Sequence, residues 1–356
     1  GHYSLSEYFI RLSTHSLESS ISRLEGDDYP EAVGVALFMA YEQALDQLRT
    51  KSPQQERIVT SLLDILSLLA ASGVPTHWLL ALEDDSDAVR DSLSFLKRSS
   101  ILQESTDGDK TIIHRLQGQV YRETYLSEQG KLNKACTYAT TILDTIDIGQ
   151  LANFEQQRQE TRNLVEQIGA VTSQDHSRPL FSDPDFVALL ATTIRNAADL
   201  GMPQLALTLT DSVTRAGDTL GPDHPSTLAS RNNLAGAYRD AGRLDEAIAL
   251  YEQTLEDRTH ILGTNHPNTL TSCNNLASAY QDAGRLNEAI TLYEQTLKDC
   301  TRILGPHHPH TLTTRHHLAE AYRAAGRFED ANKLFETPSG SEQDGTEEDP
   351  DQMTDD

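Results

Sequence analysis

The C-terminal half of the chain repeats one pattern of hydrophobic and polar positions. The phrase LGPDHPSTL begins at Leu220, LGTNHPNTL begins at Leu262, and LGPHHPHTL begins at Leu304, so the period is 42 residues. Residues 220–261 and 262–303 are identical at 30 of 42 positions. A fixed period of this size is typical of an array in which one supersecondary unit is stacked on the next.

Each unit is predicted to be a helical hairpin. In the first unit Pro225 lies in the opening turn of a helix that runs to about Asp240, and Gly242 supplies its left-handed stop. A second helix follows from Leu244 to Ile261. Its apolar residues recur at helical spacing, at Ala247, Ile248, Tyr251 and Leu255. Because one hairpin cannot bury both of its faces, the hairpins are expected to stack into a solenoid with a long concave wall.

Residues 30–125 do not repeat, and their pattern predicts three helices followed by a β-hairpin. The helices are YPEAVGVALFMAYEQALDQL from Tyr29, QERIVTSLLDILSLLAASG ending at Gly73, and DAVRDSLSFLKRSS from Asp87. The apolar positions of the first are Val33, Val35, Ala36, Phe38, Met39 and Leu45. Two apolar runs, SILQES and TIIHRL, then flank the turn TDGD, whose Asp107-Gly108 pair is a strong hairpin signal. Three helices closed by a hairpin is the winged-helix arrangement.

Between the two halves, residues 130–169 predict two helices that cap the first repeat. A degenerate copy of the hairpin is expected at about 183–219, and the last copy stops near Glu336. The chain is therefore predicted to be mainly α, with five parts in order. They are the end of a small helical domain or a linker at 1–29, a winged helix at 30–125, a helical connector at 126–176, an α-solenoid of about four hairpins at 177–336, and a disordered acidic tail at 337–356.

The charge of the chain argues against nucleic-acid binding. The formal net charge is −25, and the last twenty residues hold eight acids and no base, so the rest still carries −17. Binding to a DNA backbone requires a basic surface. The third predicted helix instead sets three bases against four acids, namely Arg90, Lys97 and Arg98 against Asp84, Asp85, Asp87 and Asp91.

The sequence also predicts neither a membrane-spanning helix nor a secretory signal peptide. No run of about 18 apolar residues predicts a membrane span, and the N-terminus does not resemble a secretory signal. The three cysteines, Cys136, Cys273 and Cys300, are too few and odd in number for a disulfide framework. Free thiols and a cytoplasmic location are therefore expected.

The last repeat is rich in histidine, at His307, His308, His310, His316 and His317. A metal site would require imidazoles that converge at fixed geometry. The first three lie on a predicted loop and the last two are adjacent on a predicted helix, so they should point apart. We therefore expect no metal site, and the cluster favours a pH-sensitive groove more than a metal site.

The order of residues in the first hairpin resembles the tetratricopeptide repeat, at Asn233, Leu234, Ala235, Tyr238, Gly242, Ala247 and Tyr251. The 42-residue period and the LG..HP.TL link are similar to the kinesin-light-chain variety of that repeat. The resemblance implies that the first helix of each hairpin faces a groove for a protein or peptide. The residues that it places in the groove are Asn232, Asn233, Arg239, Asn274, Asn275, Gln281, His316, His317 and Arg323.

These residue types suit a peptide ligand. Asparagine amides can both donate to and accept from a peptide backbone, and Arg239 and Arg323 can clamp a carboxylate. The alternative interpretation is that Asn233 and Asn275 only cap or bridge neighbouring helices.

The order of winged helix, helical connector and repeat array resembles the C-terminal part of the STAND family, the signal-transduction ATPases related to bacterial NB-ARC proteins. SLSEYFIRL near the start is similar to the end of the family's small helical domain, and DDYPEAVGVALFMAYEQAL to the start of its winged helix. TIIHRLQGQVYRE is similar to the strand-to-helix corner where the family places a histidine that senses the β-phosphate of ADP. The resemblance assigns that role to His114. Many members follow this histidine with aspartate, whereas this chain has Arg115, which departs from the family's pattern at this corner. The alternative is that His114 is an ordinary wing residue.

No G-x-x-x-x-G-K-[ST] phosphate-binding loop occurs in the sequence, so this chain is not expected to be an enzyme. The resemblance implies an upstream ATPase domain, before Tyr3, that holds ATP or ADP with Mg²⁺, and no cofactor in this chain itself. We predict a regulatory, ligand-sensing part of a STAND NTPase, monomeric alone, whose parent oligomerises on activation in bacterial immunity or development. The alternative is a stand-alone scaffold that docks other proteins.

Overall fold

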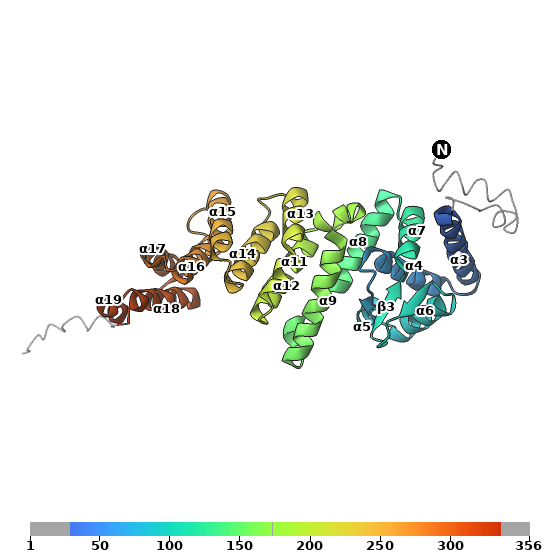
Figure 1. Ribbon diagram of the computed structural model, residues 1–356, viewed down its shortest axis with the longest axis horizontal. Coiled ribbons are helices and arrows are strands. Elements are labelled where there is room, and N and C mark those ends of the chain that lie inside the picture. Colours follow the sequence, from blue (N-terminus) through green and yellow to red (C-terminus); the bar gives the residue numbers. More distant parts are fainter. Residues whose placement is uncertain (1–28, 173, 336–356) are drawn as a thin grey trace, which may run out of the picture. The chain divides into compact units, whose positions relative to one another are not determined.

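The computed structural model describes residues 29–172 and 174–335, drawn as ribbons in Figure 1. Regular structure within these residues is mainly helical, so the mainly α class is confirmed. The chain divides into two compact units, one up to Ile261 and one from Leu262. The SLSEYFIRL segment and the predicted acidic tail lie outside the described residues. No helix in the described ranges is long and apolar enough to cross a membrane.

The N-terminal part of the first unit is built around helix α4, which packs against α6, α7 and α8. Its face from Ile58 to Leu68 is buried, with Val59, Leu62 and Ile65 fully so. The helices of this part are α3 (Tyr29–Lys51), α4 (Pro53–Leu68), α5 (Thr76–Leu79), the 3-10 turn η1 (Leu80–Leu82), α6 (Ser86–Arg98) and α7 (Arg115–Tyr125).

A three-stranded antiparallel sheet completes this part, in the order β1-β3-β2. Its strands are β1 (Val74–Pro75), β2 (Leu102–Glu104) and β3 (Lys110–Ile113). The predicted hairpin is present, because β2 pairs with β3 from Leu102 opposite Ile113 to Glu104 opposite Thr111. The short strand β1, which was not predicted, adds to the other edge of β3.

One detail of the predicted helices was wrong. The second helix ends at Leu68 and not at Gly73, because the chain turns into β1, where Gly73 takes a positive φ of 110°. A Cβ at Gly73 would also come within 2.9 Å of the Ile112 side chain. Of the apolar positions named for the first helix, Leu45 is buried on α3 and Ala36 and Met39 are exposed, and Tyr41, Ala44 and Leu48 are buried with Leu45.

The connector and the degenerate hairpin belong to the same unit. Two long helices form the connector, and the second helix of the degenerate copy is interrupted between Leu207 and Thr210. The elements are α8 (Gln129–Asp144), the 3-10 turn η2 (Ile148–Gln150), α9 (Phe154–Thr172), the 3-10 turn η3 (Asp175–Ser177), α10 (Arg178–Phe181), α11 (Pro184–Asp199), α12 (Pro203–Leu207) and α13 (Thr210–Leu220). Helix α9 packs against α11 and α13, and α11 packs along α14.

The regular hairpins begin where the sequence predicts them. In the first unit α14 (Pro225–Asp240) is followed by α15 (Leu244–Leu262), and Gly242 takes the predicted left-handed φ of 76°. The second unit contains α16 (Pro267–Asp282), α17 (Leu286–Leu304), α18 (Pro309–Ala324) and α19 (Phe328–Lys333). Its core is formed by Ala277, Ala289, Ile290, Tyr293, Leu318, Ala319, Ala321, Tyr322 and Ala331. Small residues dominate this core because the helices stack closely.

Candidate functional site

The predicted groove residues all lie on the first helix of a hairpin. Asn232, Asn233 and Arg239 are on α14 of the first unit, and the others are on α16 and α18 of the second. The two sets belong to different units, so each is described within its own unit.

Asn232 and Asn233 both make contacts inside the first unit. Asn232 is only 9% exposed, and its Oδ1 accepts a hydrogen bond from the Arg258 guanidinium on α15 at 3.5 Å. Asn233 is half-buried and donates its Nδ2 to the backbone carbonyl of Ala191 on α11 at 2.8 Å. This second bond joins two successive hairpins, which is the bridging contact that the sequence left open as an alternative for Asn233. Half-buried Arg239 pairs with Asp240 at 3.1 Å.

In the second unit, Asn274 is buried more deeply than a residue that contacts a ligand in a groove would be. It is 5% exposed, and its Nδ2 donates to Thr314 Oγ1 at 2.7 Å and contacts His310 Nε2 at 3.0 Å. Its Oδ1 is buried with no hydrogen-bond partner in the described part of the chain. In the preceding hairpin, Arg258 donates to the Oδ1 of the equivalent Asn232. The residue 42 positions after Arg258 is Cys300, which does not replace this donor.

His310 is half-buried beside this amide. Burial lowers the pKa of His310, a hydrogen bond to the backbone of Leu270 opposes the shift, and the neighbouring His308 and His317 add to the lowering. The neutral imidazole accepts from Asn274, so protonation of His310 would break this contact.

The remaining predicted groove residues are more accessible. Asn275 and Gln281 are half-buried on α16, and Arg323 is exposed on α18. His316 is exposed and pairs with Glu320 at 3.2 Å, whereas the half-buried His317 ring lies 5.9 Å from the ring of Tyr293. Their roles in ligand binding remain predictions. Within residues 29–172 and 174–335, no three His, Cys, Asp or Glu side chains are placed to hold a metal ion.

Sequence reasoning missed the function of the recurring His-Pro pair. His224, His266 and His308 are each the N-cap of the helix that the following proline begins. In each, Nδ1 accepts a hydrogen bond from the backbone N–H two residues on, at 3.1–3.2 Å. The cap satisfies one of the backbone donors that a helix leaves unpaired at its start. The repetition of HP at the head of each first helix was the available signal.

His114 has the same geometry in the N-terminal part. It follows strand β3 and caps α7, with Nδ1 accepting from the Leu116 N–H at 3.3 Å. The side chain is exposed. The strand-to-helix corner is thus present at the predicted residue, and the imidazole has its Nδ1 committed to the helix cap, so only Nε2 is available for a ligand.

Helix α9 of the connector is bound tightly to the sheet and to the loop after α4. The side-chain amide of Gln167, fully buried, accepts from the Ala70 N–H at 2.8 Å and donates to the Gly73 carbonyl at 2.9 Å. Trp78 donates its indole N–H to Glu160 at 2.9 Å, and Lys110 pairs with Glu166 at 2.8 Å. These bonds link the N-terminal helices and sheet to the connector, and hence to the first hairpins that α9 contacts.

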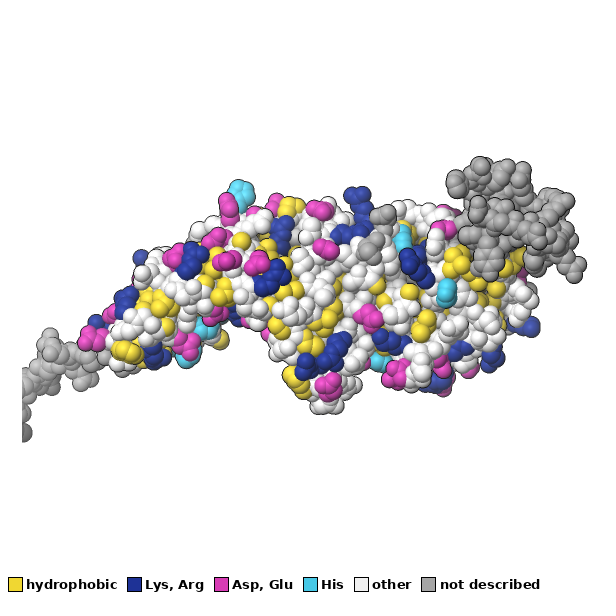
Figure 2. Space-filling model, viewed as in Figure 1, with side chains coloured by type: hydrophobic (Ala, Val, Ile, Leu, Met, Phe, Trp, Pro, Cys, Tyr) yellow, Lys and Arg dark blue, Asp and Glu magenta, His cyan; other side chains and the backbone are white. Residues whose placement is uncertain are grey.

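The surface carries acids and bases together. Figure 2 shows Lys and Arg interspersed with Asp and Glu on the face in view. On α6, Arg90 pairs with Asp87, and Lys97 pairs with Glu104 on β2. The bases that a nucleic-acid reader would need on this helix are therefore partly neutralised by neighbouring acids.

Comparison with known proteins identifies the class of the C-terminal part. The tetratricopeptide repeat family model matches residues 196–260, 232–298 and 268–337, so this part of the chain carries tetratricopeptide repeats. No curated protein sequence matches the chain.

Three solved structures show the range of similarity. A putative kinesin light chain with nearly identical TPR-like repeats from Podosopora anserina is 29% identical, with 59% of this chain and 93% of that chain covered and a TM-score of 0.42. BtubC (BKLC) from P. vanneervenii is 16% identical, with coverages of 61% and 83% and a TM-score of 0.40. A STAND protein with a tetratricopeptide repeat sensor from Pyrococcus horikoshii is 14% identical, with coverages of 78% and 49% and a TM-score of 0.36.

Proposed function

We propose that this chain is the non-catalytic, ligand-sensing part of a STAND NTPase. Its repeats bind a protein or peptide, and its N-terminal helices and sheet hold the ADP-bound, inactive state of an NTPase domain that precedes them. Ligand capture releases that hold, so that nucleotide exchange and oligomerisation follow in a bacterial defence or developmental pathway. A ligand can drive such a change only if it binds the released state more tightly than the held state.

The repeats support the binding half of the proposal. Tetratricopeptide hairpins stack into extended concave surfaces that hold peptides. Polar side chains that are partly accessible on the first helices, namely Gln281, Asn275, His317 and Arg323, supply donors and acceptors for a peptide. Asn232 and Asn274 are buried, so we assign them to holding the groove helices in position.

The observation that carries the proposal is that α9 contacts both the N-terminal part and the first hairpins within one compact unit. Gln167, Glu160 and Glu166 fix the N-terminal part to the connector, while α9 packs against α11 and α13 of the first hairpins. A scaffold needs only a cap at this end of the array. Linkage to an N-terminal part that carries a three-stranded sheet instead supports a role in transmission, because this part and the first hairpins lie in one compact unit.

For the nucleotide, the chain offers His114 and no phosphate-binding loop. Its Nδ1 caps α7, so Nε2 is the atom that would reach a phosphate held, with its Mg²⁺, by the preceding domain. A single imidazole contact fits a sensor of bound nucleotide and does not suffice as a binding site.

The structure provides a matched control for this role. His224 caps α14 through the same Nδ1 contact but lies in the array. In the protein together with its upstream region, His114→Ala should speed ADP release several-fold, whereas His224→Ala should leave it unchanged while costing similar cap energy of about 1 kcal/mol. Equal nucleotide release in the two variants would remove the sensor role.

The alternative function is a stand-alone scaffold, and one observation favours it. The cap geometry of His114 matches that of His224, His266 and His308, so a structural role accounts for His114 without any phosphate. Under this alternative, substitutions at Asn275, Gln281 and Arg323 weaken protein binding, but no substitution in the N-terminal part changes a nucleotide response.

A further inference from the structure

A cavity lies next to the His114 corner, between the end of α4, helix α7 and the end of α9. Its volume is about 480 Å³, in the range of small-molecule sites. Eleven of the residues that the structure describes line it, and His114 is not among them. None of the eleven is acidic, although acids outnumber bases 54 to 29 in the chain.

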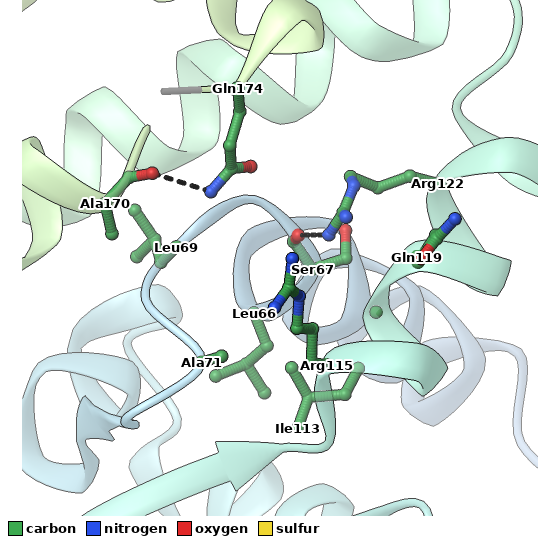
Figure 3. A pocket seen from close by; sticks show the side chains of 11 residues that line it. Leu66, Ser67, Leu69, Ala71, Ile113, Arg115, Gln119, Arg122, Ala170 and Gln174 are labelled. Atoms are coloured by element: carbon green, nitrogen blue, oxygen red, sulfur yellow. Dashed lines mark hydrogen bonds between the residues drawn. The ribbon is translucent and has the colours of Figure 1, made fainter. Parts of the chain in front are cut away.

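Two guanidinium groups enter this cavity from one face of α7. Arg115 and Arg122 are seven residues apart, which is two helical turns, and Figure 3 shows both side chains directed into the same space. Gly118 lies between them, and a Cβ there would come within 3.3 Å of the Arg122 guanidinium. A glycine inside a helix costs about 1 kcal/mol relative to alanine, and here it leaves room for the guanidinium to lie against the helix.

Neither guanidinium forms an ion pair within 4.0 Å among the residues that the structure describes. Arg122 donates to the backbone carbonyl of Ser67 near the C-terminus of α4, which uses one of its five N–H donors. Burial lowers the pKa of Arg122, the charge of the neighbouring Glu123 opposes this shift, and the charge of Arg115 adds to the lowering. A half-buried cation next to a second cation is unfavourable unless an anion joins them.

The opposite wall of the cavity contributes an acceptor and an apolar surface. Gln174, after α9, donates its Nε2 to the Ala170 carbonyl at 2.8 Å, and its Oε1 is buried without a partner in the described part of the chain. Figure 3 shows this amide on the side of the cavity across from α7. Leu66, Leu69 and Ile113 add apolar lining.

We propose that this cavity binds a small organic oxyanion, whose phosphate or carboxylate head lies between Arg115 and Arg122 and whose apolar body contacts Leu66, Leu69 and Ile113. Arginine pairs are suited to two-point recognition of such heads. A donor on the ligand would satisfy Gln174 Oε1. The site is distinct from the proposed repeat groove and from His114, and it stands whether or not the sensor function does. Its ligand would bridge the N-terminal helices and the connector.

Calorimetric titration of the whole chain tests the proposal with four probes. Phenyl phosphate and phenylacetate carry the two heads on one apolar body, inorganic phosphate lacks the body, and phenylacetamide lacks the charge. We expect at least one of the two aromatic anions to bind, more tightly than inorganic phosphate, and phenylacetamide not to bind. Binding of phenyl phosphate alone identifies phosphoryl ligands, and binding of phenylacetate alone identifies carboxylates.

Variants then locate the binding. Arg115→Ala removes an exposed side chain and should weaken the anion by about tenfold or more, and Arg115→Lys should lose part of the affinity because it keeps charge but not the fork. Arg57→Ala is the matched control, because this substitution removes the same charge at a distance from the cavity. Arg57 is exposed on α4, about 13 Å along the helix from Leu66. Far-UV circular dichroism checks that each variant folds. The proposal is overturned if neither aromatic anion binds, if phenylacetamide binds as well as the anions do, or if Arg115→Ala binds like the wild type.

Discussion

Asp64→Asn is predicted to stabilise the first unit at neutral and alkaline pH. Asp64 lies on α4, is 8% exposed, and accepts a hydrogen bond from the Tyr121 hydroxyl of α7 at 2.8 Å. Burial raises the pKa of Asp64 from 3.8 to about 6, against the lowering effects of Tyr121 and of the charges on Lys134 and Lys131. This rise of about two pK units corresponds to a loss of about 3 kcal/mol in the free energy of unfolding when Asp64 is ionised, since each unit is worth about 1.4 kcal/mol.

The sign of the effect follows from the direction of the shift. Because the folded value lies above the unfolded one, the contribution of Asp64 is fully present below about pH 4 and is lost as the pH rises through about 6. Asparagine does not ionise, and its Oδ1 still accepts from Tyr121. Its amide N–H groups need an acceptor, at a cost of about 1 kcal/mol. The variant should therefore gain about 1–2 kcal/mol at pH 8 and lose about 1 kcal/mol at pH 4.

Urea denaturation followed by tryptophan fluorescence measures this directly. Trp78 is the chain's single tryptophan, is 2% exposed, and lies in the same unit as Asp64. Asp91→Asn is the control, because Asp91 is exposed on α6. If the stability of Asp64→Asn depends on pH as steeply as that of the wild type, Asp64 does not carry the buried charge and the reasoning is refuted.

Three further predictions concern the repeats. Asn233→Ala removes the 2.8 Å bond to the Ala191 carbonyl and should lower the stability of the first unit by about 1 kcal/mol in urea denaturation. His310→Gln should flatten the pH dependence of the second unit. The pKa of His310 in the folded protein lies below its ordinary value of 6.5, so the contribution of neutral His310 to the stability of the second unit is present above pH 6.5. As the pH falls further, this contribution is lost together with the Asn274 contact. Amide hydrogen exchange in α16 and α18 measures the loss. His266→Ala should cost about 1 kcal/mol through loss of a helix cap, and His266→Asn should restore most of it in thermal melts.

Each of these has a clear contrary result. Unchanged stability of Asn233→Ala would mean that the amide does not bridge the hairpins. Protection of α16 and α18 that falls equally in His310→Gln and wild type below pH 6.5 would assign the titration to another group. An asparagine at 266 that is no better than alanine would show that the imidazole packs and does not cap.

The hairpin boundaries could be predicted because local signals fix them. Pro225 and Gly242 limit the first helix of the repeat by their own backbone preferences, and the structure begins and ends α14 at the expected residues. The β-hairpin was likewise determined locally by Asp107-Gly108.

The end of α4 could not be predicted in the same way. Leu69, Ala70 and Ala71 continue an apolar pattern that suits a helix, but the chain leaves the helix after Leu68. The Ala70 N–H is instead taken by the side chain of Gln167, which lies 97 residues later. A local window contains no information about such a partner.

The oxyanion cavity shows the same limit. Arg115 and Arg122 can be placed on one helix face from the sequence, because seven residues make two turns. The opposite wall comes from Ala170 and Gln174, about fifty residues further along the chain. Only the packing of α9 against the N-terminal part brings these groups together.

The proposed function requires a nucleotide-binding domain encoded before this chain. The most direct measurement is the sequence of the gene upstream of the codon for Tyr3. We expect a G-x-x-x-x-G-K-[ST] phosphate-binding loop within about 300 preceding codons, which is room for one or two domains. A start codon close to Tyr3 would overturn the proposed function, because His114 would then have no phosphate to sense and the array would act as a scaffold alone.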